Sequence, residues 1–219
     1  MKEESPRLSI FETFKTKTQE LTGEANRQRS IIVALATQSN PAERTRTAIS
    51  QKIAEENGIV WKNIYSGIFR DLDEILLPLG LVEEEGRLPL KRGPKALQEK
   101  GIPYYRLTQR GLIVALALKE IIGREDILER YLSDEEKNDF HKTLLNLSHI
   151  APRFAFSLFE KYVKAFCEGK LNDLLPLNQE NMRKISDESI IVQRELLEGF
   201  SHTSVTERQR TVKFLEEIT

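Results

Sequence analysis

One stretch decides the fold of this chain: Tyr104-Tyr105-Arg106-Leu107-Thr108-Gln109-Arg110-Gly111-Leu112. Tyr104, Tyr105 and Leu107 suit a β-strand, because aromatic and large apolar side chains pack well on a pleated surface. The Thr108 hydroxyl can then cap a helix whose apolar residues begin at Leu112. The stretch therefore predicts a strand that runs directly into a capped helix.

The residues before this strand predict helices followed by a hairpin. Residues 80–85 indicate a helix stop and a first strand, and residues 86–102 a loop between two strands. Apolar residues spaced three and four apart predict a helix over residues 61–77, which Pro78 and Gly80 end. Similar patterns predict helices over residues 46–56 and 25–38.

This order of elements, with Leu107-Thr108-x-x-Gly111 at its end, resembles the winged helix-turn-helix family of DNA-binding transcription regulators. The resemblance covers residues 24–122 and implies three helices plus a β-hairpin wing. It also implies that the helix beginning near Trp61 enters the major groove, while the wing lies along the minor groove or the backbone. We therefore expect a mainly α protein with a winged helix-turn-helix domain.

The rest of the chain predicts further helices. From Arg124 onward the periodic stretches are helical, over residues 152–166, 187–200 and 206–218 among others. We expect residues 123–219 to form an all-α domain for dimerisation or for sensing a ligand. Apolar residues on one side of residues 8–21 predict an amphipathic helix. The expected division is residues 1–23 for this helix, 24–122 for the winged domain and 123–219 for the helical domain.

Charge neither demands nor excludes a nucleic-acid partner, because charged residues make up 31% of the chain but the net charge is only -1. Local charge is more informative. Residues 86–110 contain seven basic residues and one acid, Glu99. Asp71, Asp73, Glu74 and residues 83–85 are acidic, however, and would repel DNA if they faced the same way as the wing.

The resemblance implies a set of DNA-contacting residues. The predicted recognition helix offers Lys62, Asn63, Tyr65, Ser66 and Arg70 once its core positions are removed, and Asn63 and Arg70 can make bidentate base contacts. Phosphate contacts are expected on one side from Arg44, Arg46 and Lys52, and on the other from the wing residues Arg87, Lys91, Arg92, Lys95 and Lys100. For Tyr65, four-residue spacing to Trp61 and Phe69 favours a core or partner role over base contact. Gly67, unusual inside a helix, leaves room for another helix or a phosphate.

Catalytic and metal-binding patterns are not found in the sequence. His141, His149 and His202 are the only histidines and have no ligand spacing, and Cys167 stands alone among apolar neighbours. We expect no enzymatic activity, no cofactor and no metal. The longest apolar stretch, residues 112–118, is too short to cross a bilayer, and we expect a cytoplasmic, nucleoid-associated protein.

Two functions remain open. The first is sequence-specific binding of double-stranded DNA for transcription regulation, by a homodimer held through residues 8–21 and 152–166. The second is a winged-helix protein-interaction module in a transcription, replication or chromosome-associated complex. Separately, the C-terminal helices offer a surface for a protein partner. Phosphate contacts make DNA binding weaken steeply with salt, which a mixed-charge protein interface need not do.

Overall fold

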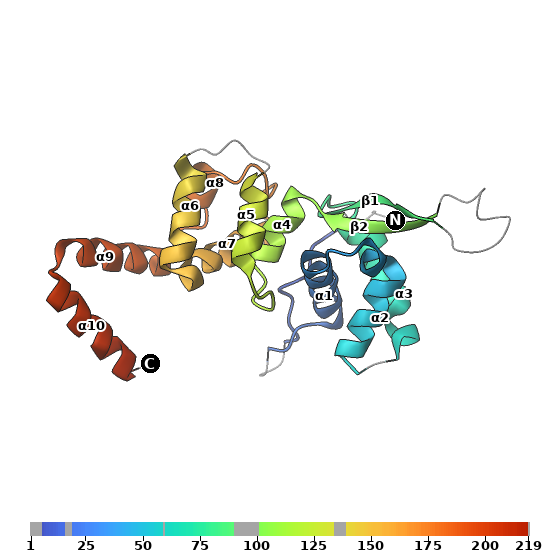
Figure 1. Ribbon diagram of the computed structural model, residues 1–219, viewed down its shortest axis with the longest axis horizontal. Coiled ribbons are helices and arrows are strands. Elements are labelled where there is room, and N and C mark those ends of the chain that lie inside the picture. The colour runs from blue at the N-terminus through green and yellow to red at the C-terminus, as the bar shows by residue number, and fades with distance from the viewer. Residues whose placement is uncertain (1–5, 16–18, 59, 90–100, 134–138, 219) are drawn as a thin grey trace.

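The computed structural model describes residues 6–15, 19–58, 60–89, 101–133 and 139–218. These residues are mainly helical, with one two-stranded antiparallel sheet of β1 (Val82–Leu88) and β2 (Ile102–Leu107). The molecule is elongated: the hairpin projects from one end, and α9 (Glu188–His202) and α10 (Val205–Ile218) extend from the other (Figure 1). Among the described helices, none combines the length and apolar content that a membrane span requires.

The N-terminal helices follow the predicted order. They are α1 (Gly23–Thr37), the short 3-10 helix η1 (Pro41–Arg44), α2 (Arg46–Glu56) and α3 (Trp61–Arg70). Threonine side chains begin two of them: Thr22 accepts a hydrogen bond from the Ala25 N–H, and Thr45 accepts one from the Ala48 N–H. The predicted helices over residues 25–38 and 46–56 are confirmed to within two residues at each end.

The predicted helix over residues 61–77 changes type before it ends. Its α-helical part stops at Arg70, and Asp71–Leu76 forms a π-helical turn (η2), in which the Leu77 N–H donates to the Leu72 carbonyl five residues back. The apolar positions Ile64, Ile68, Leu72 and Leu76 lie four residues apart. Four residues overshoot one α-helical turn by about 40°, so this spacing would carry Leu76 away from the core in a uniform α-helix. The wider π turn keeps Leu76 fully buried.

The hairpin strands are longer than predicted. Their register runs from Val82 opposite Leu107 to Leu88 opposite Ile102, with an irregularity between Glu84 and Gly86. The loop therefore starts after Leu88, and the prediction that placed its start at residue 86 was wrong. At Gly86 a Cβ atom would lie 2.7 Å from the Tyr104 hydroxyl, so the missing side chain lets the Tyr104 ring lie across the strand.

The Leu-Thr-x-x-Gly motif marks a close contact between backbones. Thr108 donates to the Gly80 carbonyl (2.6 Å) and accepts from the Gly111 N–H (3.2 Å), which begins α4 (Gln109–Leu116). A Cβ atom on Gly111 would lie only 2.0 Å from the Leu81 carbonyl oxygen. Glycine is therefore required where α4 touches the chain that enters β1.

Every regular element described in the C-terminal half is a helix, as predicted. It contains α5 (Arg124–Ser133), α6 (Asp139–Ile150), α7 (Pro152–Cys167) and the short α8 (Gln179–Arg183) before α9 and α10. Phe156, Phe159 and Tyr162 of α7 are buried and fill the bundle. Helix α4 packs against α1 on one side and against α5 and α7 on the other, so one hydrophobic core continues across residue 123.

The N-terminal amphipathic helix predicted over residues 8–21 is wrong in the described part of that segment. The chain is irregular there, and a single bridge pairs Thr13 with Leu21. Leu8 and Ile10 are both buried at 2% and 0% exposure, and an α-helix would point two residues so spaced about 200° apart. Burying both favours an extended chain, and the Ser9 N–H donates to Gln28 of α1 (2.8 Å).

Candidate nucleic-acid interface

Helix α3 displays four of the five residues predicted to read base edges. Lys62, Asn63, Ser66 and Arg70 are exposed, and we call them the α3 stripe. Lys62, Ser66 and Arg70 are spaced four apart and so lie on one side of the helix. Ile68 on the inner side is fully buried. The packing of α3 therefore presents the stripe outward.

Tyr65, the fifth predicted residue, lies differently. Its ring is half-buried and contacts Phe69, with the ring centroids 4.2 Å apart and the planes tilted by 40°. The two rings are therefore in direct contact on one side of α3. The geometry agrees with the structural role that the spacing of these aromatics favours.

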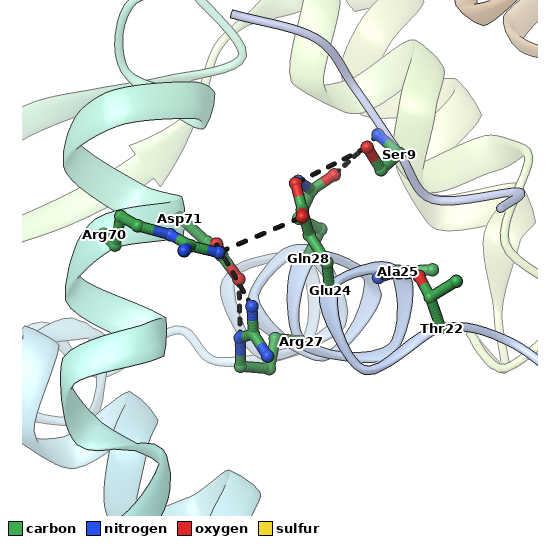
Figure 2. A network of polar contacts seen from close by, with 8 residues as sticks. All are labelled: Ser9, Thr22, Glu24, Ala25, Arg27, Gln28, Arg70 and Asp71. Carbon is green, nitrogen blue, oxygen red and sulfur yellow. Dashed lines mark hydrogen bonds and ion pairs between the residues drawn. The ribbon is translucent and has the colours of Figure 1, made fainter.

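A buried ion pair holds the end of α3 against α1. The Asp71 side chain is fully buried, and the Arg27 Nε of α1 donates to its Oδ2 at 2.7 Å (Figure 2). Arg70 also reaches Asp71 (3.4 Å) and lies 3.9 Å from Glu24. Because both guanidinium groups share one carboxylate, the exposed end of the stripe is tied to the core.

Gly67 makes this contact possible. A Cβ atom at Gly67 would lie 2.9 Å from the Arg27 Nε, so the bare backbone of α3 is the surface over which Arg27 crosses to Asp71. The sequence signalled Gly67 as a place of close approach, and the group that approaches is a side chain of α1. Neither Arg27 nor Asp71 was predicted to form this contact, since they lie 44 positions apart.

The same network reaches the N-terminal segment. Gln28 is fully buried, accepts from the Ser9 N–H (2.8 Å) and donates to Glu24 (3.1 Å) (Figure 2). A buried amide needs such partners, since leaving it without hydrogen bonds costs about 1–3 kcal/mol. Residues from the N-terminal segment, α1 and the end of α3 thus form one connected polar cluster.

Arg44 and Arg46, predicted to hold the DNA backbone, are engaged within the protein. Arg44 pairs with Glu85 and lies over the Tyr104 ring (5.4 Å to the centroid), and its side chain is 12% exposed. Arg46 pairs with Asp73, and its guanidinium carbon lies 5.1 Å from the Phe69 centroid; its side chain is 29% exposed. Phosphate contact by either residue would require these pairs to open.

The acidic run beside the hairpin is paired as well. Glu83 accepts from Arg106 (2.6 Å), Glu84 from Arg87 (2.5 Å), and Glu85 from Arg44. Each glutamate of residues 83–85 therefore has an arginine beside it, and the local charge is close to balanced. The repulsion of DNA expected from this run is correspondingly reduced.

The remaining predicted phosphate contacts are distributed along the chain. Arg87 lies near the far end of β1 in its pair with Glu84, and the Lys52 Nζ on α2 lies 4.0 Å from Glu56. Lys91, Arg92, Lys95 and Lys100 lie outside the described residues. The structure thus places the residues of the α3 stripe on one helix face, whereas Arg44, Arg46 and Arg87 form ion pairs with acidic side chains of the same chain.

Other reactive groups lie away from this surface. Burial raises the pKa of Cys167 to about 12, which keeps the thiol protonated and unreactive at neutral pH. His141 is 2% exposed and meets the Tyr131 ring edge-on, with 6.5 Å between centroids. Among the described residues, no group of three His, Cys, Asp or Glu side chains is placed to hold a metal ion.

The candidate interface is therefore the α3 stripe, held by the Arg27–Asp71 pair and flanked by the charge-balanced base of the hairpin. Comparison with protein-family models, with curated proteins and with solved structures gives no match to this chain.

Proposed function

We propose that this protein binds double-stranded DNA as a winged helix-turn-helix transcription regulator, with α3 in the major groove and the hairpin along the backbone. The observation that carries the proposal is the α3 stripe. It places a lysine, an amide, a hydroxyl and an arginine on one exposed helix face, followed in the chain by an antiparallel hairpin. These are the side chains that donate to phosphates and to base edges.

The fixed position of α3 supports base readout. Direct readout depends on bidentate contacts whose geometry is set before binding. The Arg27–Asp71 pair and the buried Ile68 hold α3 on its inner side, and a bridge between Thr45 and Tyr104 connects the start of α2 to β2. Helix and hairpin would thus meet a duplex as one unit.

The ion pairs at the base of the hairpin support a second candidate, a winged-helix module that binds another protein. Arg44, Arg46 and Arg87 are committed to acids in the free protein, which leaves a surface of mixed charge. Protein interfaces tolerate such a surface, whereas DNA-binding surfaces are usually much more basic. The module would serve a transcription, replication or chromosome-associated complex.

Duplex binding measured at several salt concentrations separates the two functions. Labelled random-sequence duplexes and a selected preferred site are titrated with the full chain by fluorescence anisotropy. Asn63→Ala should weaken binding to the preferred site by about 1–3 kcal/mol and binding to unrelated DNA much less. Lys91, Arg92 and Lys95 replaced together by alanine should weaken binding to all duplexes and flatten the salt dependence, by about one unit of slope for each phosphate that the variant no longer neutralises.

Lys142→Ala is the matched control, because Lys142 is an exposed lysine on α6, away from the α3 stripe. It should leave both affinities unchanged. If the unmodified protein shows no salt-sensitive duplex binding, the DNA-binding proposal is wrong and the interaction module becomes the better account.

A further inference from the structure

The last two helices carry apolar side chains that nothing in the described structure buries. We call α9 and α10 with the turn between them, residues 188–218, the C-terminal arm. Neither helix has a buried residue. Nine large apolar residues of the arm are 38% to 67% exposed: Ile191, Val192, Leu196, Leu197, Val205, Val212, Phe214, Leu215 and Ile218.

Both helices of the arm are nevertheless well defined at their starts. Asp187 caps α9 by accepting from the Ile190 N–H, and it pairs with Lys161 of α7. Ser204 and Glu207 form a capping box at α10, since the Glu207 carboxylate accepts from the Ser204 N–H (2.9 Å) and the Ser204 hydroxyl accepts from the Glu207 N–H (3.3 Å). Isolated helices of this length are marginal in water, so a packing partner is needed.

Most apolar residues of each helix gather on one side. In α9, Val192, Leu196 and Phe200 recur every four residues, with Leu197 beside them. In α10, Val212, Leu215 and Ile218 recur every three residues. Arg194 and Glu198 lie on the other side of α9 together with Ile191, and Arg210, Lys213 and Glu217 lie on the other side of α10. This is the pattern of helices that pack through one face.

We propose that the C-terminal arm is a homodimerisation element, in which α9 of one copy packs on α10 of a second copy about a two-fold axis. A two-fold interface is self-complementary, so each copy contributes both helices and every contact occurs twice. The proposal does not depend on the DNA-binding function.

The apolar area of the arm matches the needs of such a dimer. A whole aliphatic side chain contributes roughly 100 Å² of apolar surface, so the eight of these side chains other than Ile191, about half exposed, would bury on the order of 400 Å² per copy. A standard interface buries about 800 Å² per partner, of which about 60% is apolar. The arm thus carries the apolar surface of one side of a stable interface.

Charge beside the apolar faces favours a second copy as the occupant and α9 on α10 as the arrangement. Glu188 and Glu195 lie four residues before and three after Val192, at the edge of the α9 face, and Arg208 lies four residues before Val212, within the α10 face. Packing α9 on α10 therefore brings these two acids towards Arg208, whereas packing α9 on α9 brings acid to acid. The net charge of -1 adds little repulsion between whole copies.

Part of the apolar surface that the sequence offered for dimerisation is used within one chain. Leu8 and Ile10 belong to the core, and Phe156, Phe159 and Tyr162 of α7 are buried in the bundle, whereas Phe14 is 52% exposed. Residues 8–21 and 152–166 thus leave less apolar surface for a partner than the sequence pattern offered. The arm carries more exposed apolar side chains than either segment does among the described residues.

Sedimentation velocity of the full chain tests the proposal. The unmodified protein should sediment as a dimer at micromolar concentration. Leu197→Glu combined with Val212→Glu places a carboxylate on each apolar face and should give a monomer with at least a hundredfold weaker association. Gln209→Glu introduces the same group on the polar side of α10 and should leave the dimer intact. Far-UV circular dichroism at high concentration verifies that the body of each variant remains folded.

A monomer for the unmodified protein up to about 100 micromolar would overturn the proposal, and so would an intact dimer for the double variant. The arrangement is tested by a short thiol crosslinker in a Cys167→Ser background. Copies carrying Leu197→Cys, mixed with copies carrying Val212→Cys, should give a mixed product. Crosslinks confined to identical variants would overturn the α9-on-α10 packing.

Discussion

Gly67 lies inside α3, and its lack of a side chain leaves room for Arg27. Alanine is favoured over glycine inside a helix by about 1 kcal/mol. Here a methyl group would meet Arg27 at 2.9 Å and push the guanidinium away from the buried Asp71. Gly67→Ala should therefore lower the free energy of unfolding by about 1–2 kcal/mol, because the buried Asp71 carboxylate would lose its 2.7 Å contact with Arg27 and keep only the longer one with Arg70, which costs more than the helix gains.

A double-mutant cycle isolates this cause. In an Arg27→Ala background the clash is gone, and Gly67→Ala should then stabilise the protein by up to about 1 kcal/mol. Urea unfolding of the four proteins measures both effects. If Gly67→Ala changes the free energy of unfolding in the same direction in both backgrounds, Arg27 is not the group that requires glycine at this position. Helix propensity alone marks Gly67 as unusual in the sequence, but its contact with Arg27 of α1 forms only in the folded chain.

At the scale of elements, an ion pair between Lys161 of α7 and Asp187, which caps α9, joins these two helices. Hydrogen bonds from Lys161 and Ser189 lower the pKa of Asp187 to about 2. A group whose pKa is lowered by folding stabilises the folded state above its unfolded value, near 4, and this contribution is lost as the pH falls through the folded pKa. The α7–α9 junction should therefore hold from neutral pH to about pH 4 and loosen between pH 4 and pH 2.

Carboxyl NMR titration gives the pKa directly, and amide exchange in α9 follows the loosening of the junction. Asp187→Asn should remove this pH dependence, whereas Glu188→Gln on the exposed neighbour should preserve it. A titration of Asp187 near pH 4 would contradict the assignment.

Elements with both a periodic apolar face and a local start signal were predictable. Thr45 and Pro152 begin α2 and α7, and the predicted ends were accurate to within a residue. Residues 8–21 also have apolar residues at helical spacing, but hydrogen bonds from the Ser9 N–H to Gln28 and from Arg29 to the Ile10 carbonyl hold this segment on α1. Tertiary contacts override a periodic pattern when they bury residues that a helix would separate.

At the scale of the whole molecule, α4 joins the two halves. Leu116 is fully buried in a helix that packs against α1, α5 and α7. Leu116→Ala should therefore lower the stability by about 2–5 kcal/mol, and hydrogen exchange in α1 and α7 should accelerate together. Ile122→Ala is the control, because Ile122 is 96% exposed just beyond α4 and should change the stability by less than about 0.5 kcal/mol. Acceleration confined to one half would indicate two independent folding units.

The boundary expected at residue 123 rests on a break in pattern at Gly123, whose φ of 75° is a turn conformation. Such a turn ends one helix and begins the next, but it does not divide the hydrophobic core. The core that residues on both sides of Gly123 share depends on side-chain packing, which composition does not encode. The α3 stripe was predictable because removing the core positions of one helix leaves its exposed face. The pairing of Arg44 and Arg46 with acids was not, since it depends on where the hairpin returns.

The π turn at Asp71–Leu76 has a consequence for chains that share this architecture. A π turn holds one residue more than the α turn it replaces, while the helix on either side continues. A related chain lacking one residue there could close an ordinary α turn and still deliver the next segment to β1. An alignment that treats residues 61–77 as one uniform helix would then shift every later position by one, and would compare core residues with surface ones.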